Sequence, residues 1–295
     1  MKKISFALIL SQIVFAFTVN SCNQKSEPKI PKDEQLNISV LLDLSDRITP
    51  QVAPNQVERD KEIITTVLKV IKNKIRLRGT FTSEDRMNFI FYPQPNSSNI
   101  EEMASVLNFD LAKISPPDRK MLYKNIDSIY KLNIDNLYKI ALNSKSFDGC
   151  DIWRFFKDEV NEKCIINKPN YKNFLILLTD GYIYWKNSMM NKDNRFSYLL
   201  PTSSQITKFR NNNNWEEEFE KGDYGLIDVN KNLSNLNVLV LELNPPTEHP
   251  EDFDILKKYI GKWFIEMGIG KDNFKILKSD LPVYTKPIIE SFISK

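Results

Sequence analysis

The chain has 295 residues, of which 41% are hydrophobic and 27% are charged, so it has enough apolar material for a sizeable core and is not a disordered chain. Its 41 basic and 38 acidic residues leave a net charge of +3, which gives no electrostatic reason to expect a nucleic-acid partner. His249 is the sole histidine, which excludes a multi-histidine metal site.

Residues 1–21 are typical of a bacterial secretory signal peptide. Lys2 and Lys3 precede a mainly apolar run over 4–19, which is too short and too interrupted for a comfortable membrane span. The following Val19-Asn20-Ser21-Cys22 resembles a lipobox, in which Cys22 becomes the lipidated first residue of the mature protein. The alternative is a plain thiol after an ordinary cleavage site. We therefore expect a lipoprotein of the cell envelope, held on a membrane with its periplasmic or surface side undetermined.

Residues 22–36 read as a polar, lipid-anchored tether. They contain two prolines and show no apolar periodicity, which is typical of a spacer rather than of a packed element. No shift in composition divides the rest of the chain, so we expect one folded domain over 37–295.

Short apolar runs alternate with amphipathic stretches along this domain. An apolar, β-branched run predicts a strand over 38–44, and apolar residues at helical spacing then predict a helix over 64–75. A strand over 87–92, a helix from Ser115 to 141 and a helix opening at Asp151 follow. The remaining expected elements are strands over 174–178, 238–243 and 274–276, with helices over 253–267 and 283–293.

The order of these elements predicts the fold class. Strands that alternate with helices indicate a parallel sheet, and continuous apolar strands indicate a sheet covered on both faces. We expect a doubly wound, mostly parallel α/β domain. Ligands of such folds bind at the carboxyl ends of the strands.

The stretch 182–235 breaks the alternation and predicts an insertion after the strand that ends before Asp180. Such a length is unusual unless the segment is functional or partly structured. It could be a lid or a partner-binding insertion, or an inserted hairpin or helix without a binding role.

Polar residues follow the expected strands at the edge where a ligand would bind. The first strand leads into Asp43-Leu44-Ser45-Asp46-Arg47, a later one into Thr179-Asp180-Gly181, and a helix opens within Asp148-Gly149-Cys150-Asp151. Hard oxygen ligands from separate loops are what Mg²⁺ or Mn²⁺ requires.

This constellation resembles the von Willebrand factor A (vWA) domain family over 37–295. The family carries a metal-ion-dependent adhesion site with an Asp-x-Ser-x-Ser motif, a Thr on a second loop and an Asp in a Thr-Asp-Gly turn. Asp43, Ser45 and Asp180 match the first, second and last ligands, and Gly149-Cys150-Asp151-Ile152 resembles the second loop. The resemblance implies a Rossmann-like fold and a protein partner bound at the strand-end edge, through an acidic side chain that completes the coordination of the ion.

Two positions depart from that motif. Arg47 replaces the third hydroxyl, and its fixed positive charge opposes a metal. Cys150 replaces the Thr, and a thiol is a poor ligand for Mg²⁺. Arg47 could instead pair with Asp43 or Asp180 and lock the loops, or contact an acidic ligand directly. For Asp151, a helix N-terminal role is favoured over ligation.

The remaining cysteines offer two alternatives. If Cys22 carries lipid, Cys150 and Cys164 could form a disulfide in an oxidising compartment, or they could be two buried thiols.

Three functional hypotheses remain open. The first is a membrane-anchored, non-enzymatic binding protein, with or without a divalent cation. The second is a metal-dependent phosphohydrolase with Asp43 as nucleophile, although the second Asp expected of such an enzyme is replaced by Ser45. The third is a structural module in which Arg47 locks a non-functional metal site.

Overall fold

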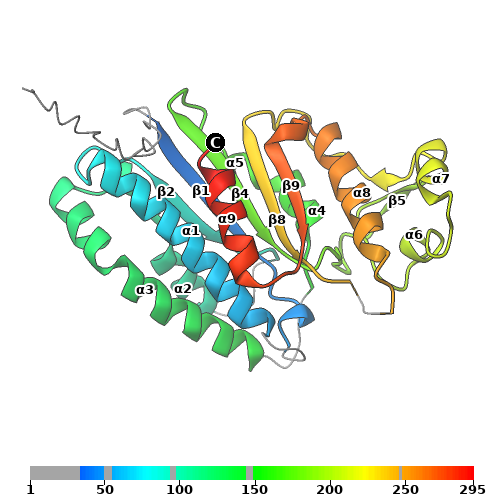
Figure 1. Ribbon diagram of the computed structural model, residues 1–295, viewed down its shortest axis with the longest axis horizontal. Coiled ribbons are helices and arrows are strands. Elements are labelled where there is room, and N and C mark those ends of the chain that lie inside the picture. The colour runs from blue at the N-terminus through cyan, green and yellow to red at the C-terminus, as the bar shows by residue number, and fades with distance from the viewer. Residues whose placement is uncertain (1–33, 50–54, 94–97, 144–148, 246–247) are drawn as a thin grey trace, which may run out of the picture. The chain divides into compact units, whose positions relative to one another are not determined.

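A six-stranded, mostly parallel sheet lies at the centre of the computed structural model, which describes residues 34–295 except for 50–54, 94–97, 144–148 and 246–247. Its strands are β1 (Gln35–Leu42), β2 (Arg86–Ile90), β3 (Phe109–Asp110), β4 (Tyr171–Leu178), β8 (Leu236–Leu243) and β9 (Phe274–Lys278), in the order β3-β2-β1-β4-β8-β9 (Figure 1). Every neighbouring pair is parallel except β2 with β3. In chain order this is the 3-2-1-4-5-6 arrangement of doubly wound folds, so the predicted fold class is confirmed.

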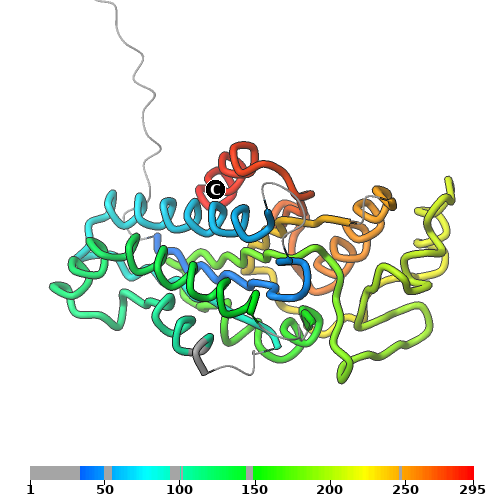
Figure 2. Tube along the Cα trace, turned by 90° about the horizontal axis from the view of Figure 1, so that it is seen from below, coloured from blue at the N-terminus to red at the C-terminus, as the bar shows by residue number. Residues whose placement is uncertain are grey.

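Helices cover both faces of the sheet. One face is packed by α1 (Gln56–Arg78), α2 (Ser98–Leu107), α3 (Pro116–Leu142) and α9 (Pro282–Ile293), and the other by α4 (Ile152–Asp158), α5 (Val160–Cys164) and α8 (Asp252–Glu266). Figure 2 shows α1 and α9 on the same side of the strands. Short 3₁₀ helices over Asp46–Ile48, Leu111–Lys113 and Lys271–Asn273 complete the connections.

Alternating side chains of the central strands build two separate cores. On β4, Phe174 and Ile176 pack towards α1 and α9, whereas Leu175 and Leu177 pack towards α4 and α8. All four are at most 1% exposed. A strand buried on both faces explains why the apolar runs of the sequence are continuous.

Two expectations differ from the structure in detail. The single helix expected to open at Asp151 and to include Val160 is two short helices, α4 and α5, which meet at Glu159. The first strand runs from Gln35 to Leu42 rather than over 38–44, so Gln35 and Leu36, which were assigned to the tether, belong to the sheet, and Asp43 is the first residue after the strand. The sequence analysis did not predict α2, because its residues show no strong helical periodicity. The structure places this helix against β2 and α3.

The predicted insertion is a small folded unit. It contains the sheet β5 (Asn191–Lys192), β6 (Arg195–Phe196) and β7 (Gly225–Leu226), with the helices α6 (Ser204–Thr207) and α7 (Trp215–Lys221). It lies beside α8 in both Figures 1 and 2. Its aromatic residues pack on that helix, with the rings of Phe219 and Tyr259 4.7 Å apart.

The predicted signal peptide, Cys22 and the tether up to residue 33 lie outside the described residues. Within the part of the chain that the structure describes, no helix combines the length and the apolar character needed to cross a membrane.

Candidate functional site

The loops after β1 and β4 meet because these strands pair in parallel register as far as Leu42 and Leu178. The Asp43 amide donates to the Leu178 carbonyl at 3.0 Å, and the Thr179 hydroxyl donates to Asp43 Oδ2 at 2.9 Å. A cavity of about 830 Å³ opens at this edge of the sheet. Its wall includes four of the predicted site residues, from three segments distant in the sequence: Ser45, Arg47, Cys150 and Asp180.

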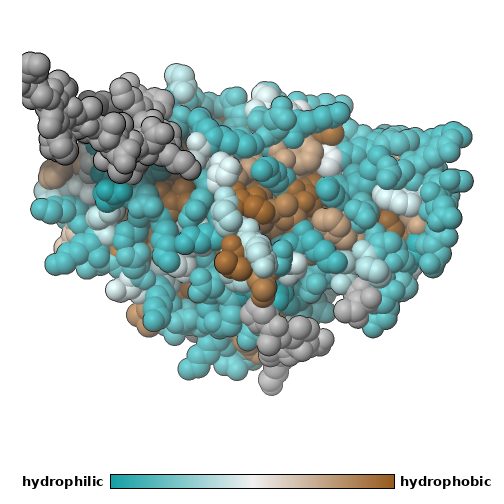
Figure 3. Space-filling model, viewed as in Figure 1, coloured by the Kyte–Doolittle hydropathy of each residue, from teal (hydrophilic) through white to brown (hydrophobic). Residues whose placement is uncertain are grey.

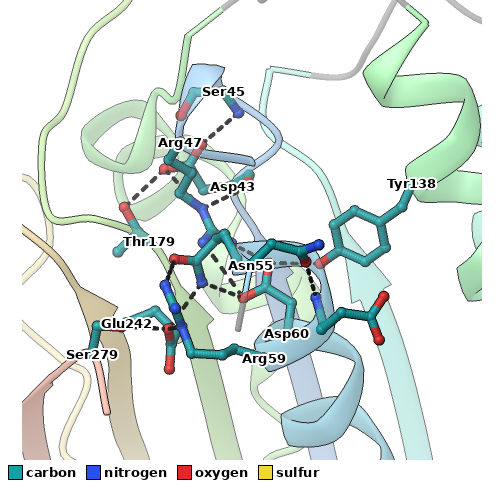
Figure 4. Close-up of polar contacts among 12 residues, drawn as sticks. Asp43, Ser45, Arg47, Asn55, Arg59, Asp60, Tyr138, Thr179, Glu242 and Ser279 are labelled. Atoms are coloured by element: carbon teal, nitrogen blue, oxygen red, sulfur yellow. Dashed lines mark hydrogen bonds and ion pairs between the residues drawn. The ribbon is translucent and has the colours of Figure 1, made fainter. Parts of the chain in front are cut away.

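Asp43 is held behind the cavity wall. It is 2% exposed, and both carboxylate oxygens accept hydrogen bonds, Oδ1 from the Ser45 amide at 2.9 Å and Oδ2 from Thr179 (Figure 4). The Cys150 thiol forms a further hydrogen bond with it. Asp43 therefore ties the loops together.

Ser45 and Asp180 face the cavity instead. Ser45 is 9% exposed, and its hydroxyl has no hydrogen-bond partner among the described residues. Asp180 Oδ1 accepts from the Tyr182 amide at 3.0 Å, across a turn that Gly181 makes with a φ of +95°. Burial, together with the nearby charge of Asp43, raises the pKa of Asp180 to about 7.

Arg47 lies on the cavity wall and anchors the first loop to α1. Its guanidinium donates to both oxygens of Asp60, at 2.7 and 3.4 Å, and its Nε donates to the Asp43 carbonyl at 2.9 Å. Nε also lies 3.8 Å from Asp43 Oδ2. Burial alone would lower the pKa of Arg47, but the charges of Asp60 and Asp43 outweigh it and raise that pKa.

Asp60 is the main residue that the sequence analysis missed. It is fully buried and also accepts from Tyr138 of α3 at 2.7 Å and from Gln56 at 2.9 Å. Asp60 stands one helical turn before Ile64, on the apolar stripe of α1. A carboxylate on such a stripe is a sequence signal for a buried partner.

A second buried carboxylate, Glu242, extends this network to β8 and β9. Its Oε2 accepts from Arg59 Nε at 2.8 Å, from Gln56 at 2.9 Å and from the Ser279 hydroxyl at 2.9 Å. Glu242 has a φ of +72°, which is rare for a residue with a side chain, and stands where the pairing of β8 with β9 shifts register. Its position inside the apolar run 238–243 was the available sequence signal.

Asp151 caps the amino terminus of α4, which agrees with the helix N-terminal role favoured from the sequence. Its Oδ1 accepts from the Arg154 amide at 3.0 Å, and the Ser188 hydroxyl donates to Oδ2. Both oxygens are thus engaged in hydrogen bonds, and Asp151 is not part of the cavity wall. Asp151 therefore positions the loop that carries Cys150.

The disulfide alternative is wrong, and the alternative of two buried thiols describes the structure. Cys150 and Cys164 are both free. Cys150 lies at the carboxyl edge of the sheet beside Asp43, whereas Cys164 contacts Ser39 within β1. Burial raises the pKa of Cys150 well above its usual value and that of Cys164 to about 12.

The insertion supplies part of the cavity wall. Tyr182, Tyr184, Leu200 and Pro201 line it, and Tyr184 is 38% exposed. Tyr182 is fixed because its hydroxyl donates to Asp252 at 2.8 Å. Tyr184 forms an isolated bridge with Cys150, and Gly149 is needed there because a Cβ would lie 2.5 Å from the Tyr184 carbonyl oxygen.

These residues do not fit an ion held as in the family motif. Of the five motif positions, Asp43 is engaged by hydrogen bonds, Arg47 places a cation 3.8 Å from it, and Cys150 offers a thiol. Only Ser45 and Asp180 retain oxygen donors that face the cavity. No group of three or more His, Cys, Asp or Glu residues within the described ranges is arranged to hold a metal.

Comparison with solved structures finds similarity to proximal thread matrix protein 1 from the mussel byssus, with 12% identity over 88% of this chain and 48% of that chain and a TM-score of 0.37. Two crystal structures of the pilus adhesin SpaC from Lactobacillus rhamnosus GG match at 10% and 9% identity, over 88% of this chain and 30% of theirs, with TM-scores of 0.43 and 0.42. This chain thus spans about half of the first protein and under a third of the second. No protein-family model and no curated protein match the sequence.

Proposed function

We propose that this protein is a membrane-anchored lipoprotein whose α/β domain binds a protein partner at the strand-end cavity, without catalysing a reaction. The observation that carries this proposal is the cavity of about 830 Å³, on which residues from three separate loops converge. Doubly wound folds bind their ligands at this edge. The polar network behind the wall holds the loops in one arrangement, which suits a preformed binding site.

The buried state of Asp43 argues against the phosphohydrolase alternative. A nucleophile must present an oxygen to its substrate, whereas both oxygens of Asp43 accept hydrogen bonds behind the wall. We therefore expect no phosphatase activity with Mg²⁺, and an activity lost in Asp43→Asn would overturn this part of the proposal.

The donor chemistry of the site favours binding without a resident ion. Arg47 supplies, next to Asp43, the positive charge that a metal would otherwise supply. If an ion did bind the folded protein, it would raise the melting temperature in proportion to its affinity. We expect no such rise with Mg²⁺ or Mn²⁺ in calorimetry, and a concentration-dependent rise would restore the metal site.

The membrane anchor is proposed from the sequence alone. Mass spectrometry of the mature amino terminus should show the added mass of a lipid on Cys22. We expect Cys22→Ala to abolish both this added mass and the retention of the protein in the membrane fraction. An unmodified Cys22 in the membrane-bound wild type would contradict the anchor.

Site-specific photocrosslinking tests the binding site itself. A photoreactive residue in place of the wall residue Tyr184 should crosslink a partner in cells that express the full chain. The same residue in place of Leu132, which is 62% exposed on α3, is the matched control. Equal crosslinking at both positions would overturn the proposal. Crosslinking at Tyr184 that persists when Ser45→Trp blocks the Ser45 end of the cavity in a correctly folded chain would also overturn it.

A further inference from the structure

Both arginines on the cavity wall are neutralised from behind it. Arg47 donates to Asp60 at 2.7 Å, and Arg59 donates to Glu242 at 2.8 Å. The side chains of these two carboxylates are 0% and 1% exposed, so they belong to the protein interior. An acidic ligand would therefore meet cations whose charge is already balanced.

Three carboxylates on the same wall have no such partner. Asp46, Asp180 and Glu248 line the cavity, and none of them lies within 4.0 Å of a basic nitrogen in the part of the chain that the structure describes. Asp43, directly behind the wall, adds a further negative charge. Its carboxylate lies 3.8 Å from Arg47 Nε, which already serves Asp60 through the same guanidinium. The described surface of the cavity thus carries an excess of negative charge, which is complete above about pH 7, where Asp180 is ionised.

Ser45 adds an independent sign of a ligand. It is more than nine-tenths buried, it lines the cavity, and its hydroxyl oxygen has no partner among the described residues. A hydroxyl oxygen can accept a hydrogen bond from a cationic N–H group as well as donate one. The oxygen is open to the cavity and not sealed in the interior, so an N–H group of a ligand can reach it.

We infer that the partner inserts a lysine or arginine side chain into this cavity, where its cationic head meets Asp180 and the Ser45 hydroxyl. This inference rests on the proposed function and reverses the acidic, metal-bridged contact that the family resemblance implies. The ammonium or guanidinium group would take the place of the ion, and the exposed carboxylates of Asp46 and Glu248 lie on the same wall.

An exposed wall residue, together with exposed apolar residues that follow another wall residue in the chain, favours a protein partner over a small organic cation. Tyr184 is on the wall, and Leu281, Val283 and Tyr284 follow the wall residue Ser279 at the start of α9. The last three are 46%, 67% and 60% exposed, and Figure 3 shows apolar surface where α9 begins. Exposed tyrosine and aliphatic side chains around a polar centre are typical of a protein interface.

Two capped peptides that differ only in their central residue test the inference. Acetyl-Gly-Leu-Lys-Leu-Gly-amide and its glutamate counterpart are titrated into the full chain, with and without Mg²⁺, and binding is followed by backbone amide NMR shifts around Ser45 and Tyr182. We expect the lysine peptide to bind at least about tenfold more tightly than the glutamate peptide, independently of Mg²⁺ and more weakly at high salt. Asp180→Asn should weaken it severalfold, whereas Asp272→Asn, at an exposed position near the opposite end of the sheet, should not.

Each other outcome overturns the inference in a distinguishable way. Preferential binding of the glutamate peptide that requires Mg²⁺ would restore the metal-bridged contact and leave the cavity as the binding site. Preferential binding of that peptide without Mg²⁺ would reverse the charge of the partner and also leave the cavity in place. If neither peptide shifts the amides of the cavity, the cationic contact is rejected, and crosslinking at Tyr184 decides the proposed function separately.

Discussion

At the scale of single residues, Asp180 links the charge of the cavity to the stability of the fold. Its pKa is about 7 in the folded protein, against an ordinary value of 3.8. The native state therefore holds a proton that the unfolded chain releases between these values. It follows that the free energy of unfolding falls as the pH rises through this window, and the cost of the charged form is complete above about pH 7.

Asp180→Asn removes that cost while keeping an oxygen for the Tyr182 amide. We expect the variant to melt a few degrees above the wild type at pH 8 and at nearly the same temperature at pH 4, since about 1 kcal/mol shifts the melting temperature of a domain this size by roughly 2–4 °C. Calorimetry across this pH range measures the difference. A difference between the two proteins that stays constant with pH would contradict the raised pKa, and Asp127→Asn, on the exposed face of α3, is the control.

Arg47 shows how one substitution changes the chemistry of an otherwise familiar motif. Arg47→Ser restores the family hydroxyl but leaves Asp60 buried without its cation. Removing one partner of a buried ion pair costs about 3–5 kcal/mol, so the variant should melt roughly 10 °C lower than the wild type. Arg47→Ser combined with Asp60→Asn should recover part of the loss. Unchanged melting of the single variant would show that the pair does not lock the loop.

At the scale of elements, the insertion depends on its attachment to α8. Arg210 donates to both oxygens of Asp252, at 2.8 and 2.6 Å, and Asp252 also accepts from Tyr182. The side chain of Arg210 is 11% exposed and that of Asp252 is 0% exposed. This buried contact joins the insertion to the helix and holds the cavity wall that Tyr182 and Pro201 form.

Arg210→Ala should therefore loosen the insertion more than the sheet. Hydrogen exchange is expected to accelerate over 182–235, while β1, β4 and β8 keep their protection, because local openings follow packed units. Arg154→Ala provides the matched control, since its pair with Asp158 is 48% and 38% exposed and contributes little. Faster exchange throughout the sheet in Arg210→Ala would show that the insertion is not a separate unit.

Elements with strong periodicity could be predicted from the sequence, and the partners of buried charges could not. The apolar runs over 174–178 and 238–243 predicted two strands inside the sheet, β4 and β8, and the helical stripe 64–75 predicted the central part of α1. The same stripe gave no partner for Asp60, because Arg47 meets it only after the loop has turned back onto the helix. Likewise, Glu242 interrupts an apolar strand in a way that only the register shift with β9 explains.

At the scale of the whole molecule, the two described cysteines test how far apart the structure places the loops that carry them. Cys150 lies beside Asp43, just after β1, whereas Cys164 contacts Ser39, four residues earlier in the chain. About 13 Å of strand separates these two contact residues, so the thiols cannot pair without rearrangement. We expect both to resist alkylation in the native state, because burial raises both pKa values, and both to react after unfolding without reductant. Peptide mass spectrometry counts the modified thiols. A 150–164 crosslink in native protein would contradict the arrangement of these loops.

β1 also separates the beginning of the domain from its cavity. The strand starts at Gln35 and ends at Leu42, next to Asp43, so its eight residues span roughly 26 Å from one pole of the sheet to the other. The residues that precede Gln35 therefore join the domain at the end of β1 that is farther from the cavity. The cavity and the residue at which the described chain begins therefore lie at opposite ends of one strand, and the entry of the chain into the sheet occupies none of the cavity wall.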